Sequence, residues 1–179
     1  AGKAGYVHIP NMQADGLNEF VKYFYPQLHK EGLIVDVRGN GGGNVSPQII
    51  ERLQREAAMI TVARNGSVNV DPSGMHLGPK VMLLNEFAAS DGDIVAYRFK
   101  KHKLGPVIGK RSWGGVVGIR GSLPLLDGGY LNRPEFSRYD LEGKEWIMEG
   151  VGVEPDIFVE NDPAREYAGI DDQLEKAIA

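Results

Sequence analysis

A serine at a sharp junction between an apolar strand and a helix constrains this chain more than any other feature. Residues 80–84 form an apolar run that ends at the turn-forming Asn85, which predicts a buried strand. From Ser90 onward, apolar residues recur at helical spacing until the stop signal at residues 104–106. A hydroxyl placed there lies beside unpaired backbone N–H groups that can receive a developing oxyanion. With Asp93 three residues on, Ser90 also fits a capping box, so a structural and a catalytic role both stay open.

A second strand-to-helix junction carries three consecutive glycines. Residues 33–37 are typical of a buried strand, and a helix is expected to begin near Ser46-Pro47. Between them, Gly41-Gly42-Gly43 exposes backbone N–H groups with no side chains in the way. Such a loop suits an oxyanion or phosphate cradle as well as a plain turn. The residue spacing does not match either nucleotide-binding motif. Asn44 stands where a dinucleotide fingerprint needs glycine, and residues 105–112 have one residue too few between their glycines for a phosphate-binding loop.

The rest of the pattern predicts one α/β domain. An amphipathic helix from about Leu17 is expected to end or kink at Pro26. Asn65-Gly66 predicts a hairpin between residues 59–64 and 67–70, and 127–129 predicts a second turn between short strands. Asp171 is expected to cap a short terminal helix. At 179 residues and 42% hydrophobic, the chain can bury one sizeable core.

Composition excludes several function classes. A net charge of -4 without a clustered basic run argues against a nucleic-acid surface. No apolar run is long enough to cross a membrane, so neither nucleic acid nor membrane is an expected partner. The chain has no cysteine and no pair of histidines at metal-ligand spacing. A metal site is therefore not predicted, and no cofactor is expected.

Four sequence blocks, in order, resemble the tail-specific, or C-terminal processing, serine peptidases. The resemblance extends from Gly5 to about Asn161, and residues 85–93 and 113–118 are similar to the tricorn branch of that family. It implies the ββα spiral shared by the ClpP and crotonase folds. It also implies that residues 1–179 are a single peptidase core domain of a larger chain, preceded there by a histidine-bearing segment and a PDZ-like domain. The blocks are Asp36-Val37-Arg38-x-Asn40-Gly41-Gly42-Gly43, Asn85-x-x-Ala88-Ala89-Ser90, Gly109-Lys110-x-x-Trp113-Gly114-Gly115 and Glu149-x-x-Gly152-Val153-x-Pro155-Asp156.

The resemblance assigns catalytic roles by position. Ser90 matches the nucleophile that forms an acyl-enzyme, and Glu149 matches an acidic residue that supports the catalytic network by hydrogen bonding. The oxyanion hole matches the backbone N–H groups of Asp91 and Gly42, with Gly41 as the alternative one residue away. For Glu149 a solvated surface carboxylate stays open as the alternative.

The substrate is expected to run along Gly41, Gly115 and Val116. Residues 113–119 combine small and β-branched residues, as a strand edge that is open to an extended peptide does. Backbone hydrogen bonds there could hold a peptide in register beside Ser90, although an ordinary bulged strand fits the same pattern.

The chain offers no general base for Ser90. Gly115 stands where the processing peptidases have a lysine, and an unperturbed Lys110 is protonated at neutral pH. His102 lies roughly 18 Å from Ser90 along the same helix, and His8 could approach only through the fold. In the tricorn branch the base is a histidine from the upstream segment, so the isolated chain is expected to be inactive.

The resemblance also implies a cytoplasmic homo-oligomer, a hexamer, that cleaves short peptides and has aminopeptidases as further partners. A preference for basic side chains is in doubt, because residues 57–64 contain no acid and Arg64 would oppose it. Two alternatives remain. One is a non-catalytic peptide-binding or structural fragment, and the other is a crotonase-type acyl-CoA enzyme. The sequence blocks at residues 85–93 and 149–156 argue against the crotonase-type enzyme.

Overall fold

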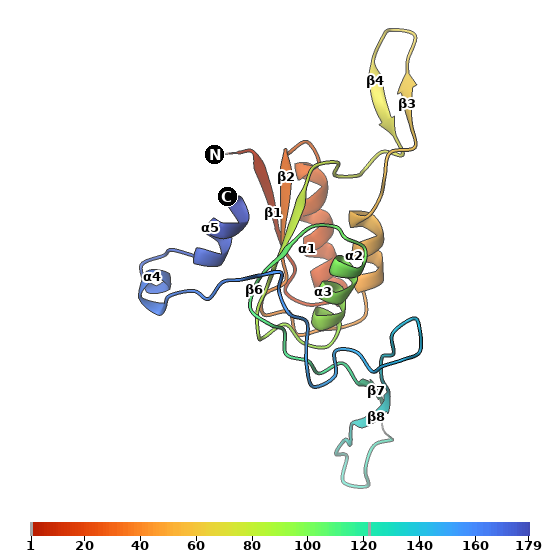
Figure 1. Ribbon diagram of the computed structural model, residues 1–179. Coiled ribbons are helices and arrows are strands. Elements are labelled where there is room, and N and C mark those ends of the chain that lie inside the picture. The colour runs from red at the N-terminus through yellow and green to blue at the C-terminus, as the bar shows by residue number, and fades with distance from the viewer. Residues whose placement is uncertain (1, 122) are drawn as a thin grey trace.

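The computed structural model describes residues 2–121 and 123–179, and a five-stranded parallel sheet forms its centre (Figure 1). All four neighbouring pairs of strands in this sheet are parallel. Parallel neighbours need crossover connections, and helices in these connections give the α/β class that the sequence predicts. In spatial order the strands are β1 (Ala4–His8), β2 (Gly32–Asp36), β5 (Lys80–Leu84), β6 (Val107–Gly109) and β9 (Ile157–Phe158).

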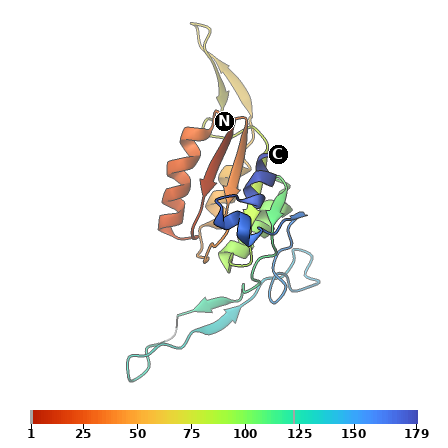
Figure 2. The ribbon, with the colours of Figure 1, turned by 90° about the vertical axis from the view of Figure 1, so that its left-hand side faces the viewer.

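Helices cover both faces of the sheet (Figures 1 and 2). One face packs against α1 (Ala14–Phe24), α2 (Ser46–Leu53) and α3 (Asp91–Lys101), and the other packs against α5 (Asp172–Ile178). Side chains alternate accordingly along β2, where Leu33 and Val35 point into the larger core and Ile34 into the smaller one. Because both faces are buried, the central strands are continuous apolar runs.

The helix boundaries follow local sequence signals. The predicted stop at Pro26 is confirmed, since α1 ends at Phe24 and a short helix, η1 (Tyr25–Gln27), contains the proline. The predicted cap of the terminal helix is also confirmed, because the Asp171 carboxylate accepts the Leu174 N–H at 3.0 Å. The short α4 (Pro163–Tyr167) is not predicted by the sequence analysis. Within the described residues, no helix is both long and apolar enough to cross a membrane.

Two antiparallel hairpins project from the core in opposite directions (Figure 2). The first joins β3 (Met59–Val62) to β4 (Val68–Asp71), and the second joins β7 (Gly118–Arg120) to β8 (Arg133–Phe136). Both confirm the turns predicted at residues 65–66 and 127–129. The strand edge expected over residues 113–119 is wrong for residues 113–117, since β7 starts only at Gly118, where it pairs with β8.

Arg38 attaches the C-terminal segment to the sheet. Its guanidinium donates to Asp36, at the end of β2, and to Asp171 and Gln173 at the start of α5. The Asp36 carboxylate is almost fully buried and also accepts the Tyr6 hydroxyl at 2.7 Å. Burial alone would raise the pKa of Asp171, but the hydrogen bonds from Arg38 and the Leu174 N–H outweigh it and lower that pKa.

Replacing Arg38 by Gln should destabilise the 179-residue chain by about 3–5 kcal/mol, because the buried Asp36 carboxylate loses its counter-charge. Arg165→Gln is the matched control, since its pairs with Asp172 and Glu175 are largely exposed and should contribute at most about 1 kcal/mol. Urea denaturation at neutral pH measures both losses. Equal losses for the two variants would contradict this assignment.

The stabilising contribution of Asp171 should depend on pH with a defined sign. A lowered pKa means that the contribution is complete above the unfolded pKa of about 3.9 and disappears as pH falls through the lower folded pKa. The stability difference between wild type and Arg38→Gln should therefore narrow only in strong acid. Denaturation curves at a series of pH values test this, and a difference that narrows between pH 7 and 5 would contradict it.

Candidate active site

Ser90 occupies the sharp turn between β5 and α3 in a strained conformation. Its φ of 57° and ψ of -118° lie in a region that non-glycine residues rarely adopt. Such strain costs on the order of 1–3 kcal/mol and is commonly found at functional sites. The Ser90 hydroxyl makes no capping hydrogen bond to α3, so the capping-box interpretation of this hydroxyl is wrong. The turn instead leaves the hydroxyl available at the N-terminus of a helix.

A cavity of about 810 Å³ lies beside Ser90. The glycine loop and the first three turns of α3 form one side of it, and residues 116–119 with Phe136 and Arg138 form the other. It therefore lies at the carboxyl ends of β2 and β5, which is where parallel α/β sheets commonly bind ligands. Its lining brings together Gly43, Ser90 and Asp91 from two loops that are far apart in the sequence.

A fully buried asparagine holds the glycine loop against the Ser90 turn. The Asn40 side chain donates to the Ile9 carbonyl at 2.8 Å and accepts the Gly42 N–H at 2.9 Å. The Asn40 carbonyl accepts the Ala89 N–H at 2.8 Å. A Cβ atom on Gly42 would lie 2.7 Å from the Ser90 Cβ, so only glycine fits at this contact.

Backbone N–H groups near the Ser90 hydroxyl that are without hydrogen-bond partners within residues 2–121 and 123–179 include those of Gly41, Gly43 and Asp91. The Gly42 N–H is already paired with Asn40, which disfavours Gly42 as an oxyanion donor. Gly43 lines the same cavity as Ser90 and Asp91. The geometry therefore favours Asp91 and Gly43 as the pair of donors.

The Asp91 side chain fixes the position of its own backbone. Its carboxylate is buried and accepts both the N–H and the hydroxyl of Ser46, the first residue of α2. The Arg98 guanidinium donates to the same Ser46 hydroxyl at 2.7 Å. These contacts join the N-termini of α2 and α3, the two helices that follow the two loops of the site. The sequence predicts a helix start near Ser46 but gives neither Ser46 nor Arg98 a role in the site, although Ser90, Ile94 and Arg98 share one helical face by their spacing of four.

Asp93 fixes the segment that follows β6. Its Oδ1 accepts the Gly114 N–H at 2.8 Å, whereas its Oδ2 has no hydrogen-bond partner in the described part of the chain. Burial raises the pKa of Asp93, and the nearby Ser112 hydroxyl and Gly114 N–H oppose that rise. Asp93 therefore serves to hold residues 112–115 against α3 and does not line the cavity itself.

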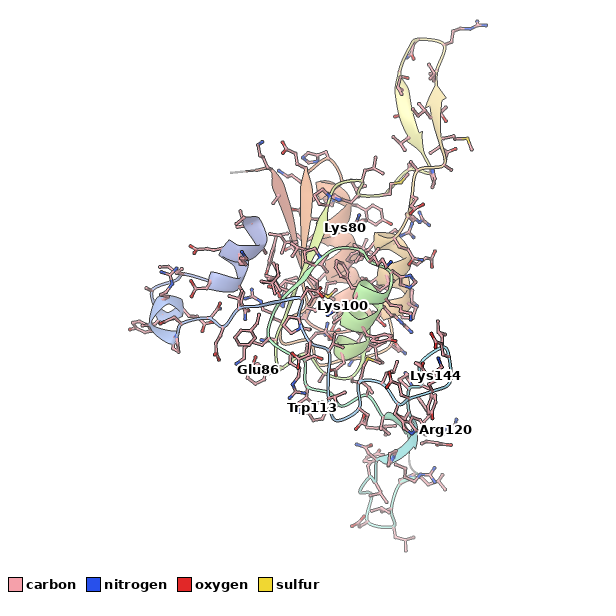
Figure 3. The ribbon with its side chains drawn as sticks, viewed as in Figure 1. Lys80, Glu86, Lys100, Trp113, Arg120 and Lys144 are labelled. Atoms are coloured by element: carbon pink, nitrogen blue, oxygen red, sulfur yellow. The ribbon has the colours of Figure 1, made fainter. Side chains whose placement is uncertain are left out.

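Glu149 supports the cavity wall through two backbone N–H groups and does not line the cavity itself. Its Oε2 accepts the Val116 N–H at 2.7 Å and the Val117 N–H at 2.8 Å, although the side chain is exposed. The expectation that the Val116 N–H is free to pair with a substrate strand is therefore wrong, because Glu149 occupies it. Val116 still lines the cavity, whereas a Cβ atom on Gly115 would meet the ring of Trp113. The Trp113 side chain, labelled in Figure 3, is exposed.

None of the four histidines, all within the described residues, lines the cavity that contains Ser90. His8, His29 and His102 are exposed elsewhere, and His76 is buried with both ring nitrogens unpaired. Burial and the nearby Lys80 charge lower the pKa of His76. The described residues thus place the Ser90 hydroxyl and unpaired backbone N–H groups at one cavity that no histidine side chain lines.

Lys110 is unsuited to the role of base. Hydrogen bonds from its ammonium to Glu160 and Glu86, at 2.8 and 2.7 Å, raise the pKa of Lys110 and keep it protonated. The described ranges contain no group of three or more histidine, aspartate or glutamate side chains arranged to hold a metal ion.

Comparison with known proteins gives a consistent result. The sequence profile of peptidase family S41 matches residues 3–159. The tricorn protease of Thermoplasma volcanium is 43% identical over 177 residues, and the tricorn protease homolog of Saccharolobus solfataricus is 44% identical over 179 residues. A crystal structure of the tricorn protease superposes with a TM-score of 0.92 at 43% identity. Each match covers 99% of this chain but only 16–17% of the relative, so the chain spans about a sixth of their length.

Replacing Gly42 by Ala should disrupt the contact between the two loops. The added Cβ would approach Ser90 and the Ala89 carbonyl oxygen, and a φ of +91° is itself unfavourable for alanine. We expect a loss of about 2 kcal/mol or more in unfolding free energy. Gly41→Ala is the control, because a Cβ there meets nothing within 4 Å. Chemical denaturation compares the two variants, and equal stabilities would show that the close approach of Gly42 to Ser90 is absent.

Proposed function

Because the chain belongs to peptidase family S41, we propose that it is the catalytic core of a tricorn-type serine endopeptidase that hydrolyses short peptides. One observation carries this proposal. Ser90 is strained into a turn that leaves its hydroxyl uncapped, in a cavity shared with Asp91 and Gly43, whose N–H groups are unpaired. Free donors fixed by a turn need no reorganisation when charge develops on a substrate oxygen.

In the proposed reaction, the Ser90 Oγ attacks the scissile carbonyl carbon and a base accepts the hydroxyl proton. The carbonyl oxygen becomes an oxyanion that the N–H groups of Asp91 and Gly43 stabilise. The C–N bond then breaks, the proton passes to the leaving amine, and an acyl-enzyme remains on Ser90. Attack by water releases the second product and restores the hydroxyl. Losing one such donor typically costs roughly 2.7–4 kcal/mol of transition-state stabilisation.

The base is proposed to come from elsewhere in a longer protein, as a histidine carried by an upstream segment. Two findings support this: no histidine of the described chain lines the cavity, and the matched relatives are about six times longer than the chain. The proposed role of Glu149 is to position the cavity wall through Val116 and Val117. Gly41 and Gly115 remain proposed contacts of the substrate backbone.

We further propose that residues 1–179 form one core domain with the ββα spiral of the ClpP and crotonase folds. A single large apolar cluster that extends from Val7 to Val153 supports one domain, and the repeated strand-helix units of the parallel sheet support the spiral.

A cytoplasmic homo-oligomer, with a hexamer and aminopeptidase partners, is also proposed from the tricorn resemblance. The β3–β4 hairpin supports association, because four of its apolar side chains are at least 60% exposed and an isolated two-stranded hairpin is marginally stable in water. These side chains are Met59, Ile60, Val62 and Val68.

Ser90→Ala in the full-length protein should lower kcat/KM for peptides by at least about 10³-fold, because the attacking atom is lost. A fluorophosphonate probe should label Ser90 of the full-length protein and should label the isolated 179-residue chain far more slowly. Unchanged peptide turnover in Ser90→Ala would overturn the assignment of Ser90 as the nucleophile, and the absence of peptide turnover in the wild-type full-length protein would favour a non-catalytic or acyl-CoA-binding role. Rapid Ser90-dependent turnover by the isolated chain would show instead that the base lies within it.

Glu149→Ala in the full-length protein should lower kcat/KM on the order of 10²-fold, since the wall at residues 116–117 loses its support. Glu149→Gln should recover part of this, because its amide oxygen can still accept both N–H groups. Glu154→Ala is the control for an exposed carboxylate in the same segment. If Glu149→Ala retains wild-type kcat/KM, Glu149 is a surface carboxylate without a catalytic role.

A further inference from the structure

Three side chains form a chain of hydrogen bonds behind the backbone of Asp91. The Arg98 guanidinium donates to the Ser46 hydroxyl at 2.7 Å, and the same hydroxyl donates to Asp91 Oδ1. Ser46 is fully buried and Asp91 is almost so, while Arg98 is half-buried in the wall of the cavity that contains Ser90. Water therefore has little access to compete for these contacts, which makes them stronger than the same contacts on an open surface.

The direction of the chain is fixed by the chemistry of its two ends. A guanidinium can only donate, and an ionised carboxylate can only accept. Arg98 therefore occupies a lone pair of the Ser46 oxygen, and the Ser46 proton points toward Asp91. Hydrogen bonds arranged head to tail polarise one another, so the guanidinium strengthens the contact between Ser46 and Asp91.

Both oxygens of the Asp91 carboxylate are attached to α2 by this arrangement. Asp91 Oδ2 accepts the Ser46 N–H at 2.9 Å, and it caps a helix whose own N-cap residue, Val45, makes no side-chain capping hydrogen bond. Few side-chain torsions separate the carboxylate from the backbone of the same residue. A fixed carboxylate therefore limits the movement of the Asp91 N–H, which is one of the two proposed oxyanion donors.

The reaction is sensitive to small displacements of such a donor. An oxyanion donor acts at about 2.7–3.1 Å from the oxygen that it receives. A misplacement of about 1 Å can lower the rate by about 10²-fold, even when its origin is distant from the reacting atoms. Ser90, the residue before Asp91, is strained at a φ of 57°, so relaxation of this turn would move the Asp91 N–H unless α2 held it.

We propose that Arg98, acting through the Ser46 hydroxyl, is a positioning residue that keeps the Asp91 N–H aligned with the oxyanion. This inference rests on the proposed peptidase function and adds two side chains to its machinery. The role requires no contact between Arg98 and the substrate. Arg98 acts by fixing the Ser46 proton, Ser46 acts by fixing the Asp91 carboxylate, and the carboxylate fixes the donor.

Kinetics of the full-length protein test this role. Arg98→Met removes the guanidinium donor and should lower kcat/KM for peptides by about 10-fold. The loss should lie in kcat, with KM changed by less than about 2-fold, because the oxyanion exists only after attack by Ser90. Arg98→Lys keeps a charged donor and should recover part of the loss. A loss that lies in KM alone would overturn the positioning role.

Arg120→Gln is the matched control for the removal of one arginine. Arg120 lies on β7 (Figure 3), pairs with Glu135 and does not line the cavity. Its kcat and KM should equal those of the wild type. A loss of kcat in Arg120→Gln as large as that in Arg98→Met would overturn the assignment, because the effect would then follow from the charge alone.

A double-mutant cycle tests the path through Ser46. Ser46→Cys keeps the volume of the buried side chain and replaces its hydroxyl by a much weaker donor and acceptor. In the Ser46→Cys protein, Arg98→Met should change kcat/KM by less than about 2-fold, because the link is already broken. Effects of the two substitutions that simply multiply would overturn the proposed path. If Ser46→Cys fails to fold, the comparison of Arg98 variants with a transition-state mimic decides.

A peptide boronic acid is that mimic, since its adduct with Ser90 resembles the tetrahedral intermediate. Arg98→Met should raise the Kd of the boronic acid by about the factor that it removes from kcat/KM. Binding of the corresponding uncleaved peptide to Ser90→Ala should be equal with and without Arg98→Met. A merely structural defect would weaken both kinds of binding, and that result would overturn the inference.

The outcomes separate this inference from the proposed function. Ser90-dependent peptide hydrolysis with equal kcat/KM for wild type and Arg98→Met would overturn the positioning role and leave the peptidase function standing. If the full-length wild type hydrolyses no peptide, the proposed function fails, and the boronic acid still decides the inference. Equal Kd for wild type and Arg98→Met, or no binding to either, would then overturn it.

Discussion

The Asn40 side chain holds together the three chain segments from which the candidate site is built. It donates to Ile9 after β1, accepts from Gly42 in the glycine loop, and its backbone carbonyl accepts from Ala89 in the Ser90 turn. Because the residue is fully buried, these hydrogen bonds have no competing water, and losing one would leave an unsatisfied polar group in the interior. Asn40 thus brings Gly42 close to Ser90 and leaves the neighbouring N–H of Gly43 unpaired.

Strain at Ser90 is sustained by the packing around it. The residues on both sides are fixed, Ala89 by Asn40 and Asp91 by the N-terminus of α2, so the unfavourable backbone angles cannot relax. The same contacts leave the Asp91 N–H free at the start of α3, where the helix dipole adds positive potential. One arrangement therefore accounts for the uncapped hydroxyl of the half-buried Ser90, the unpaired N–H groups beside it and the position of Arg98, eight residues further along the helix.

Elements determined by local sequence could be predicted, and contacts determined by the tertiary fold could not. The strand at residues 80–84, the Asn65-Gly66 hairpin and the terminal helix follow from apolar runs, turn residues and a capping carboxylate, and the structure confirms all three. The pairing of the Gly42 N–H, by contrast, depends on a side chain two residues away that folds back on the loop. The partner of Glu149 lies 33 residues earlier, and no local pattern indicates that a loop carboxylate will occupy the Val116 N–H. The position of Arg138 in the cavity wall could not be predicted for the same reason. Arg138 reaches the cavity only because the β7–β8 hairpin forms.

The central claim is that Ser90 attacks a carbonyl whose oxygen is received by Asp91 and Gly43. A crystal structure of the full-length protein bound to a peptide boronic acid, a mimic of the tetrahedral intermediate, tests it most directly. The account predicts a covalent bond from boron to the Ser90 Oγ, with one boronate oxygen 2.7–3.1 Å from the backbone nitrogens of both Asp91 and Gly43. A bond to another residue, or an oxygen that contacts neither nitrogen, would contradict it.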